Sequence, residues 1–127
     1  MSTHDMHLAA VTAMADNAVR TAQVARRLLA DHVDLPELLD VRLQPTETQA
    51  RVDLQPRISD VRLWAERLGI ELRFKNRPDS FDDRCGQEHA DGTTEIAGVT
   101  VTLGAMRFIE REEWAAIQAE QPTAVSA

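Results

Sequence analysis

The segment that decides the fold spans residues 59–75 and reads SDVRLWAERLGIELRFK. Its first part carries apolar residues at the three- and four-residue spacing of one helix face, namely Val61, Trp64, Ala65 and Leu68. Gly69 then stands where helices commonly end. Its last part alternates charged residues with the apolar Ile70, Leu72 and Phe74, as in a strand with one buried face. A helix and a strand joined this tightly are expected to pack face to face.

Two more segments show the alternation of half-buried strands. In the first, a polar turn at residues 45–48 separates two alternating runs, whose apolar residues are Val41, Leu43, Val52 and Leu54. In the second, an Ala97-Gly98 turn separates two runs with the apolar residues Ile96, Val99, Val101 and Leu103. Each of these segments predicts a pair of adjacent strands.

A long helix is predicted for residues 5–31, which contain no glycine or proline and are rich in good helix formers. One stripe with alternating spacings of three and four runs along it: Leu8, Val11, Ala15, Ala18, Ala22, Ala25 and Leu29. Such a helix is about 40 Å long, more than a small domain needs. Two interpretations stay open. The stripe packs on the protein's own sheet, with or without a break near Asp16 and Asn17, or it pairs with a second copy.

A last helix is predicted for residues 109–120, because Ile109, Trp114 and Ile117 share one side and acidic residues fill its first turn. Residues 121–127 have the character of a frayed tail.

The expected order is helix, strand, strand, helix, strand, strand, strand, helix. This order predicts an α+β fold in which an antiparallel sheet of about five strands is covered by helices on one face. Residues 1–127 are expected to form one domain, with the α+β core at residues 40–120. The expected core anchors are Leu43, Val52, Leu54, Val61, Trp64, Leu68, Ile70, Leu72, Phe74, Ile96, Val99 and Val101.

Composition excludes several classes of protein. Hydrophobic residues make up 43% and charged residues 28% of the chain, as in folded domains and unlike disordered ones. The net charge of -7 repels nucleic acids and anionic lipid, so neither is an expected partner. No stretch of about 20 apolar residues is present to span a membrane. The single cysteine and the absence of a signal-peptide pattern make a cytoplasmic location the expectation.

A polar stretch at residues 76–92 is expected to be a long loop, and long loops on compact domains are often functional. It holds Cys85 and His89 at a C-x3-H spacing among several carboxylates. These residue types bind zinc or iron, so Cys85 and His89 are candidate metal ligands, and Cys85 assisted by His89 is a candidate nucleophile. The other interpretations are a solvated acidic loop and a loop that binds a partner protein, with Phe81 as its exposed anchor.

The motifs GxSxG, Walker A, HExxH and GxGxxG are all absent. We therefore expect a non-catalytic accessory or regulatory protein that binds another protein and needs no cofactor. Its expected interaction residues are the stripe of the first helix and Phe81, and a homodimer through the first helix is one form of this interaction. Two alternatives stay open: a small-molecule or metal-binding protein, or an enzyme, that uses residues 76–92, and a DNA-binding regulator.

Two stretches of the sequence resemble known proteins. They are Ile58 to Arg73, with its Trp-Ala-Glu-Arg-Leu-Gly core, and the later Gly98-Val99-Thr100-Val101. They are similar to small uncharacterised proteins of actinobacterial genomes, plasmids and phages. The resemblance implies a helix laid on an antiparallel sheet and a phage or mobile-element context. It implies no activity and no functional residue.

Overall fold

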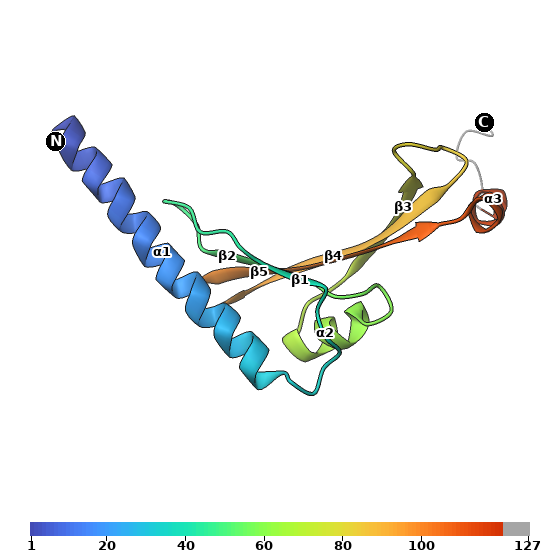
Figure 1. The fold of residues 1–127 in the computed structure, drawn as a ribbon, viewed down its shortest axis with the longest axis horizontal. Coiled ribbons are helices and arrows are strands. Elements are labelled where there is room, and N and C mark those ends of the chain that lie inside the picture. Colours follow the sequence, from blue (N-terminus) through green and yellow to red (C-terminus); the bar gives the residue numbers. More distant parts are fainter. Residues whose placement is uncertain (121–127) are drawn as a thin grey trace.

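The computed structural model describes residues 1–120. Its elements are, in order, α1 (Thr3–Asp31), β1 (Asp40–Leu43), β2 (Arg51–Gln55), α2 (Val61–Leu68), β3 (Arg73–Pro78), β4 (Gly86–Ile96), β5 (Val99–Ile109) and α3 (Arg111–Glu120). Figure 1 shows α1 at one end of the sheet, α2 against its middle and α3 at the opposite end. The order of elements, the α+β class and the long first helix confirm the sequence prediction.

The strands form one five-stranded sheet in the order β1-β2-β5-β4-β3. β1 and β2 pair antiparallel, as expected, and so do β4 and β5. Ala97 and Gly98 make the β4–β5 turn with positive φ angles, which two-residue hairpin turns require. The pairing of β2 with β5 is parallel, so the predicted antiparallel sheet is mostly antiparallel and has one parallel pair. Parallel pairing is possible because α2, β3 and β4 form a long connection between the two strands.

Residues 76–92 do not form a long loop. Residues 76–78 complete β3 and residues 86–92 begin β4, so the irregular part is the turn between them. β4 pairs with β5 along its full length and with β3 along its first half. The side chains of this half are polar on one face, and the other face holds Gly86, Ala90 and Gly92 together with Glu88, which pairs with Arg107. The apolar alternation that marks the other strands is therefore missing here.

The core lies between one face of the sheet and helices α1 and α2. Most expected anchors are buried or pack against this core: Val52, Leu54, Val61, Trp64, Leu68, Ile70, Leu72, Ile96, Val99 and Val101. Leu43 and Phe74 are wrong predictions, with 50% and 39% of their surface exposed. Both belong to the outermost strands of the sheet, β1 and β3, where a side chain has a neighbouring strand on one side only.

Helix α1 begins before the predicted start because Ser2 and Asp5 form a capping box. The Ser2 hydroxyl accepts a hydrogen bond from the Asp5 N–H, and the Asp5 carboxylate accepts one from the Ser2 N–H. This arrangement satisfies N–H groups that a helix leaves unpaired at its start. α1 then runs without a break to Asp31.

Helix α3 starts at Arg111, since Ile109 is the buried last residue of β5. Trp114 is the buried residue of α3 and packs over Gly86 of β4. Arg107 of β5 holds the helix to the sheet, because its guanidinium donates to Glu88 of β4 and to Glu113 of α3. The predicted tail at residues 121–127 lies outside the described residues.

Candidate functional site

The stripe of α1 is not the face that packs on the sheet. The buried residues of α1 are Thr21, Val24, Ala25 and Leu28, and the stripe lies roughly a quarter turn around the helix from them. Ala25 belongs to both sets, and Ala18 is half-buried. The rest of the stripe faces solvent, with Leu8, Val11 and Leu29 exposed by 59%, 66% and 46%. We name the stripe without the buried Ala25 the α1 seam: Leu8, Val11, Ala15, the half-buried Ala18, Ala22 and Leu29.

The first half of α1 extends past the sheet (Figure 1). Residues 3–16 contain no buried side chain. The first side-chain hydrogen bond from α1 to the sheet region comes from Asn17, whose amide donates to the Thr46 carbonyl over 2.8 Å. The α1 seam therefore begins on a free-standing part of the helix and continues onto the part packed on the core.

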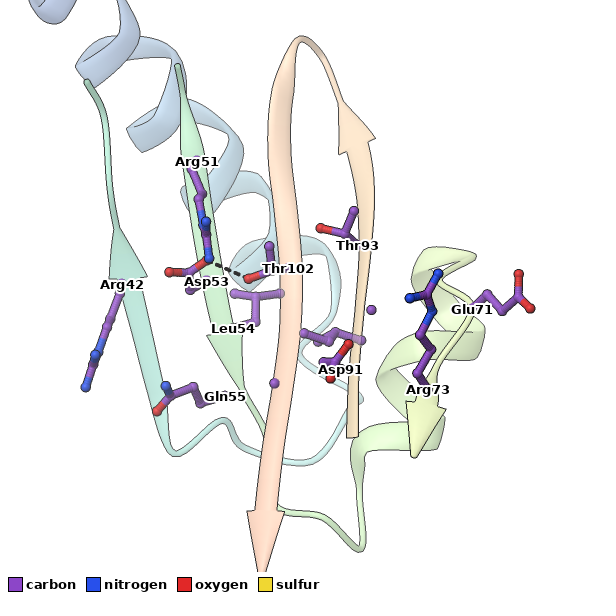
Figure 2. Close-up of a pocket in the computed structure, with 13 residues that line it drawn as sticks. Arg42, Arg51, Asp53, Leu54, Gln55, Glu71, Arg73, Asp91, Thr93 and Thr102 are labelled. Atoms are coloured by element: carbon purple, nitrogen blue, oxygen red, sulfur yellow. Dashed lines mark hydrogen bonds and ion pairs between the residues drawn. The ribbon is translucent and has the colours of Figure 1, made fainter. Parts of the chain in front are cut away.

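The second surface is the sheet face that the helices leave uncovered. A shallow concavity of about 700 Å³ on this face is lined by strands β1 to β5 (Figure 2). Its central carboxylate, Asp53, accepts hydrogen bonds from Arg51 over 2.7 Å and from the Thr102 hydroxyl. Arg51 also forms an ion pair with this carboxylate. The concavity therefore presents polar and charged binding groups on an open face of the sheet.

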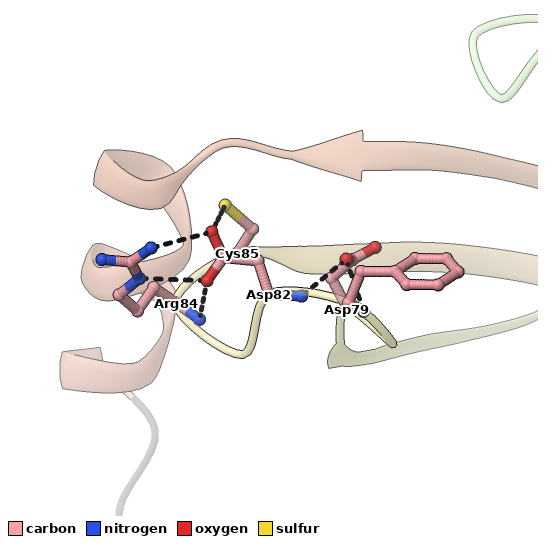
Figure 3. A network of polar contacts seen from close by, with 5 residues as sticks. Asp79, Asp82, Arg84 and Cys85 are labelled. Carbon is pink, nitrogen blue, oxygen red and sulfur yellow. Dashed lines mark hydrogen bonds and ion pairs between the residues drawn. The ribbon is translucent and has the colours of Figure 1, made fainter.

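The third surface is the turn between β3 and β4, which Figure 3 shows from close by. The Asp79 carboxylate accepts hydrogen bonds from the side chain of Gln87 and from the N–H groups of Phe81 and Asp82. These bonds lower the pKa of Asp79 and order the turn. Phe81 stands at the tip with 99% of its surface exposed. The turn thus presents one aromatic ring to solvent, as expected for an anchor.

Cys85 is buried beside this turn, and its Sγ lies 3.8 Å from a carboxylate oxygen of Asp82. Burial, followed by the negative charge of Asp82, raises the pKa of the thiol. Reactive and metal-binding cysteines act as thiolates, a form that this environment disfavours. The geometry therefore does not support Cys85 in either role.

His89 lies on β4 and bonds to Gln87, with 2.8 Å between His89 Nε2 and Gln87 Oε1. Cys85 and His89 are four residue steps apart along extended chain, a distance of about 13 Å, so one metal ion cannot bind both. Within residues 1–120, no three side chains of the metal-binding types come together. The two candidate ligands are thus apart, and we do not propose a metal site.

The basic residues of β3 lie together on one face of the sheet. Arg73, Lys75 and Arg77 all point to the uncovered sheet face, opposite Asp91, His89 and Gln87 of β4. The signal was present in the sequence as a basic residue at every second position. Arg77 joins this face because residues 76–78 continue β3 and do not belong to a loop.

Comparisons of the chain with models of protein families, with curated proteins and with solved structures find no match. In the part of the chain that the structure describes, no helix is both long and apolar enough to cross a membrane. The function is therefore inferred from the three surfaces described above.

Proposed function

We propose that this protein acts by binding another protein and not by catalysis, and that its α1 seam pairs with the α1 seam of a second copy. An accessory or regulatory role in the cytoplasm is part of this proposal. The observation that supports it is the free-standing start of α1. Residues 3–16 bury no side chain against the sheet, yet they carry Leu8 and Val11 on one side of the helix.

The free-standing part of α1 lacks the packing that stabilises most helices. Residues 3–16 span about 21 Å, and isolated helices of this length are only marginally stable in water. The capping box of Ser2 and Asp5 satisfies N–H groups at the start but adds no apolar contact. A partner that covers the α1 seam buries Leu8 and Val11 together and supplies the missing packing.

The spacing of the α1 seam suits a second helix as the partner. From Leu8 to Leu29 the full stripe spans three heptads of alternating three- and four-residue steps, the pattern of a two-helix coiled coil, and the seam keeps all of these positions except the buried Ala25. The small side chains of Ala15, Ala18 and Ala22 let the two helices approach closely in the middle. The larger apolar residues lie towards the two ends of the seam. The sizes of its side chains are therefore similar from either end, as an antiparallel pair of identical helices requires.

Charge favours an antiparallel pair of identical helices. Residues 3–16 contain Asp5 and Asp16 and no arginine or lysine. Residues 17–31 contain Arg20, Arg26 and Arg27 and one aspartate. An antiparallel pair therefore sets the acidic half of each helix against the basic half of the other, and it also opposes the two helix dipoles.

Sedimentation velocity of the full chain at several concentrations tests this proposal. We expect a dimer that dissociates when Ala15 and Ala22 are both replaced by glutamate, because four carboxylates then face one another across the seam. Both positions are exposed in a single copy, so the far-UV circular dichroism of the sheet should persist.

The matched control is the pair Ala9→Glu and Gln23→Glu, which adds the same charge to exposed positions of α1 away from the seam. This control should stay dimeric. A wild-type chain that remains monomeric up to about 100 μM overturns the proposal, and so does equal dissociation of the two double variants.

A further inference from the structure

Strand β3 forms a free edge of the five-stranded sheet, because it pairs with β4 and with no other strand among the described residues. All six of its residues, Arg73–Pro78, are exposed. A free edge presents unpaired backbone N–H and C=O groups and can accept an additional strand. β3 therefore has the backbone geometry of a docking edge.

The side chains of β3 favour an added strand that carries negative charge. Arg73, Lys75 and Arg77 stand on one face along about 14 Å of strand. None of the three forms an ion pair with any described residue; even Arg73, opposite Asp91 in the register, does not pair with it. Three unneutralised positive charges in a row attract carboxylates at alternate positions of a neighbouring strand.

The other face of β3 supplies an apolar contact. The Phe74 ring is partly exposed, and the Arg62 guanidinium of α2 lies 4.2 Å from its centroid. An added strand that alternates acidic with apolar residues can place its apolar side chains beside Phe74 while its carboxylates face Arg73 and Lys75.

A second copy of β3 does not fit this edge. Pairing two β3 strands sets Arg73, Lys75 and Arg77 against the same charges, which is destabilising for cross-strand neighbours. Basic residues on edge strands hinder such pairing between identical chains, and the same charges favour an acidic partner. We therefore propose that β3 docks an extended acidic segment of a different protein, which adds to the sheet as a sixth strand.

This interaction is separate from the α1 seam, which lies on a different element. A fluorescent peptide of alternating glutamate and valine, eight residues long, is a suitable probe for the full-length protein. We expect binding by fluorescence anisotropy, with amide NMR shifts concentrated on β3. Methylation of alternate backbone nitrogens of the peptide should abolish binding, because it removes donors that strand pairing requires.

Charge reversal by Arg73→Glu and Arg77→Glu is expected to weaken peptide binding at least about tenfold. The matched control, Arg57→Glu with Arg111→Glu, makes the same change in net charge at exposed sites outside β3 and α1 and should keep the affinity. The Ala15→Glu, Ala22→Glu variant should also bind the peptide, so a failure of α1 pairing is distinguishable from a failure of this proposal.

Two outcomes overturn the proposal that β3 docks an acidic strand. One is an affinity that is insensitive to backbone methylation, which indicates charge attraction without strand pairing. The other is a single-stranded DNA probe that binds the basic face more tightly than the peptide does, which assigns the surface to a nucleic acid.

Discussion

A methyl group on Gly86 of β4 would overlap the indole ring of Trp114 on α3. The helix therefore lies close to the sheet only because this position has no side chain. Trp114 is the buried residue of α3, and the other attachment is Arg107, which joins Glu88 to Glu113. One ring and one guanidinium thus fix the helix at the end of the sheet away from α1.

Replacement of Gly86 by alanine should lower the free energy of unfolding by about 1–3 kcal/mol, because the methyl group forces Trp114 out of its contact. Urea denaturation followed by tryptophan fluorescence measures this loss. Gly104→Ala is the matched control, since no atom lies within 4 Å of a methyl group there. Equal losses for the two variants would contradict the close packing of α3.

The two tryptophans should respond differently to replacement by phenylalanine. Trp64 Nε1 donates to the Pro36 carbonyl over 2.9 Å, whereas the buried Trp114 Nε1 has no partner among the described residues. Trp64→Phe should therefore cost about 1–2 kcal/mol more than Trp114→Phe, because it leaves a carbonyl unpaired. Urea denaturation followed by far-UV circular dichroism compares them, and a larger loss for Trp114→Phe would refute the assignment.

The stabilising effect of Arg107 should depend on pH. Hydrogen bonds from Arg107 lower the pKa of Glu113 below its ordinary value of 4.5. Since the folded state then holds the carboxylate more strongly, this stabilisation is present above pH 4.5 and is lost as the pH falls through the lowered value. Arg107→Met should destabilise the protein clearly at neutral pH and less at about pH 3.5.

Denaturant titrations at the two pH values measure this difference. Arg42→Met is the control, because Arg42 pairs with Asp40 only two residues away, on an exposed strand, where ion pairs contribute little. A destabilisation by Arg107→Met that is the same at both pH values would argue against the ion pair with Glu113.

The imidazole of His89 should titrate below its ordinary value of 6.5. Burial is the main reason for the lowered pKa of His89, and the positive charge of Arg77 adds to it. Proton NMR of the His89 ring measures the value directly, and Arg77→Gln should raise it. Arg57→Gln removes a charge elsewhere and should leave the value unchanged. A pKa of His89 at or above 6.5 would show that Arg77 does not face the ring.

The lowered pKa of His89 makes the free energy of unfolding depend on pH. Because the folded state disfavours the imidazolium, the unfolded state binds more protons on His89 between the lowered pKa and 6.5. The free energy of unfolding should therefore rise with pH across this window. His89→Gln should flatten that rise, as measured by urea titrations at several pH values, and an unchanged slope would count against a lowered pKa of His89 in the folded state.

The element order could be predicted because it is encoded locally. The helix of residues 61–68 follows from apolar residues at helical spacing and from Gly69, and the Ala97-Gly98 turn follows from its neighbouring alternation. The first half of β4 could not be predicted in this way. Its inward positions are small because Trp114 packs over Gly86, while the backbone of Glu71 lies against Gly92. Both contacts join segments far apart in the chain.

Some of the candidate sites could also be predicted from the sequence, and others could not. The stripe of α1 and the exposed Phe81 could be found from residue type and spacing. The separation of Cys85 from His89 could not be found in this way, because it depends on β4 being extended. The basic face of β3 needed the register with β4, which shows that Arg73 and Arg77 share the uncovered face.

The sequence by itself determined the helices, the turns and the alternation of the core strands, because these depend on interactions between residues close in the chain. Tertiary structure decided the parallel pairing of β2 with β5, the face of α1 that packs on the core and the free edge at β3. Each of these depends on which distant segments share backbone hydrogen bonds or apolar contacts. No local pattern specifies that choice.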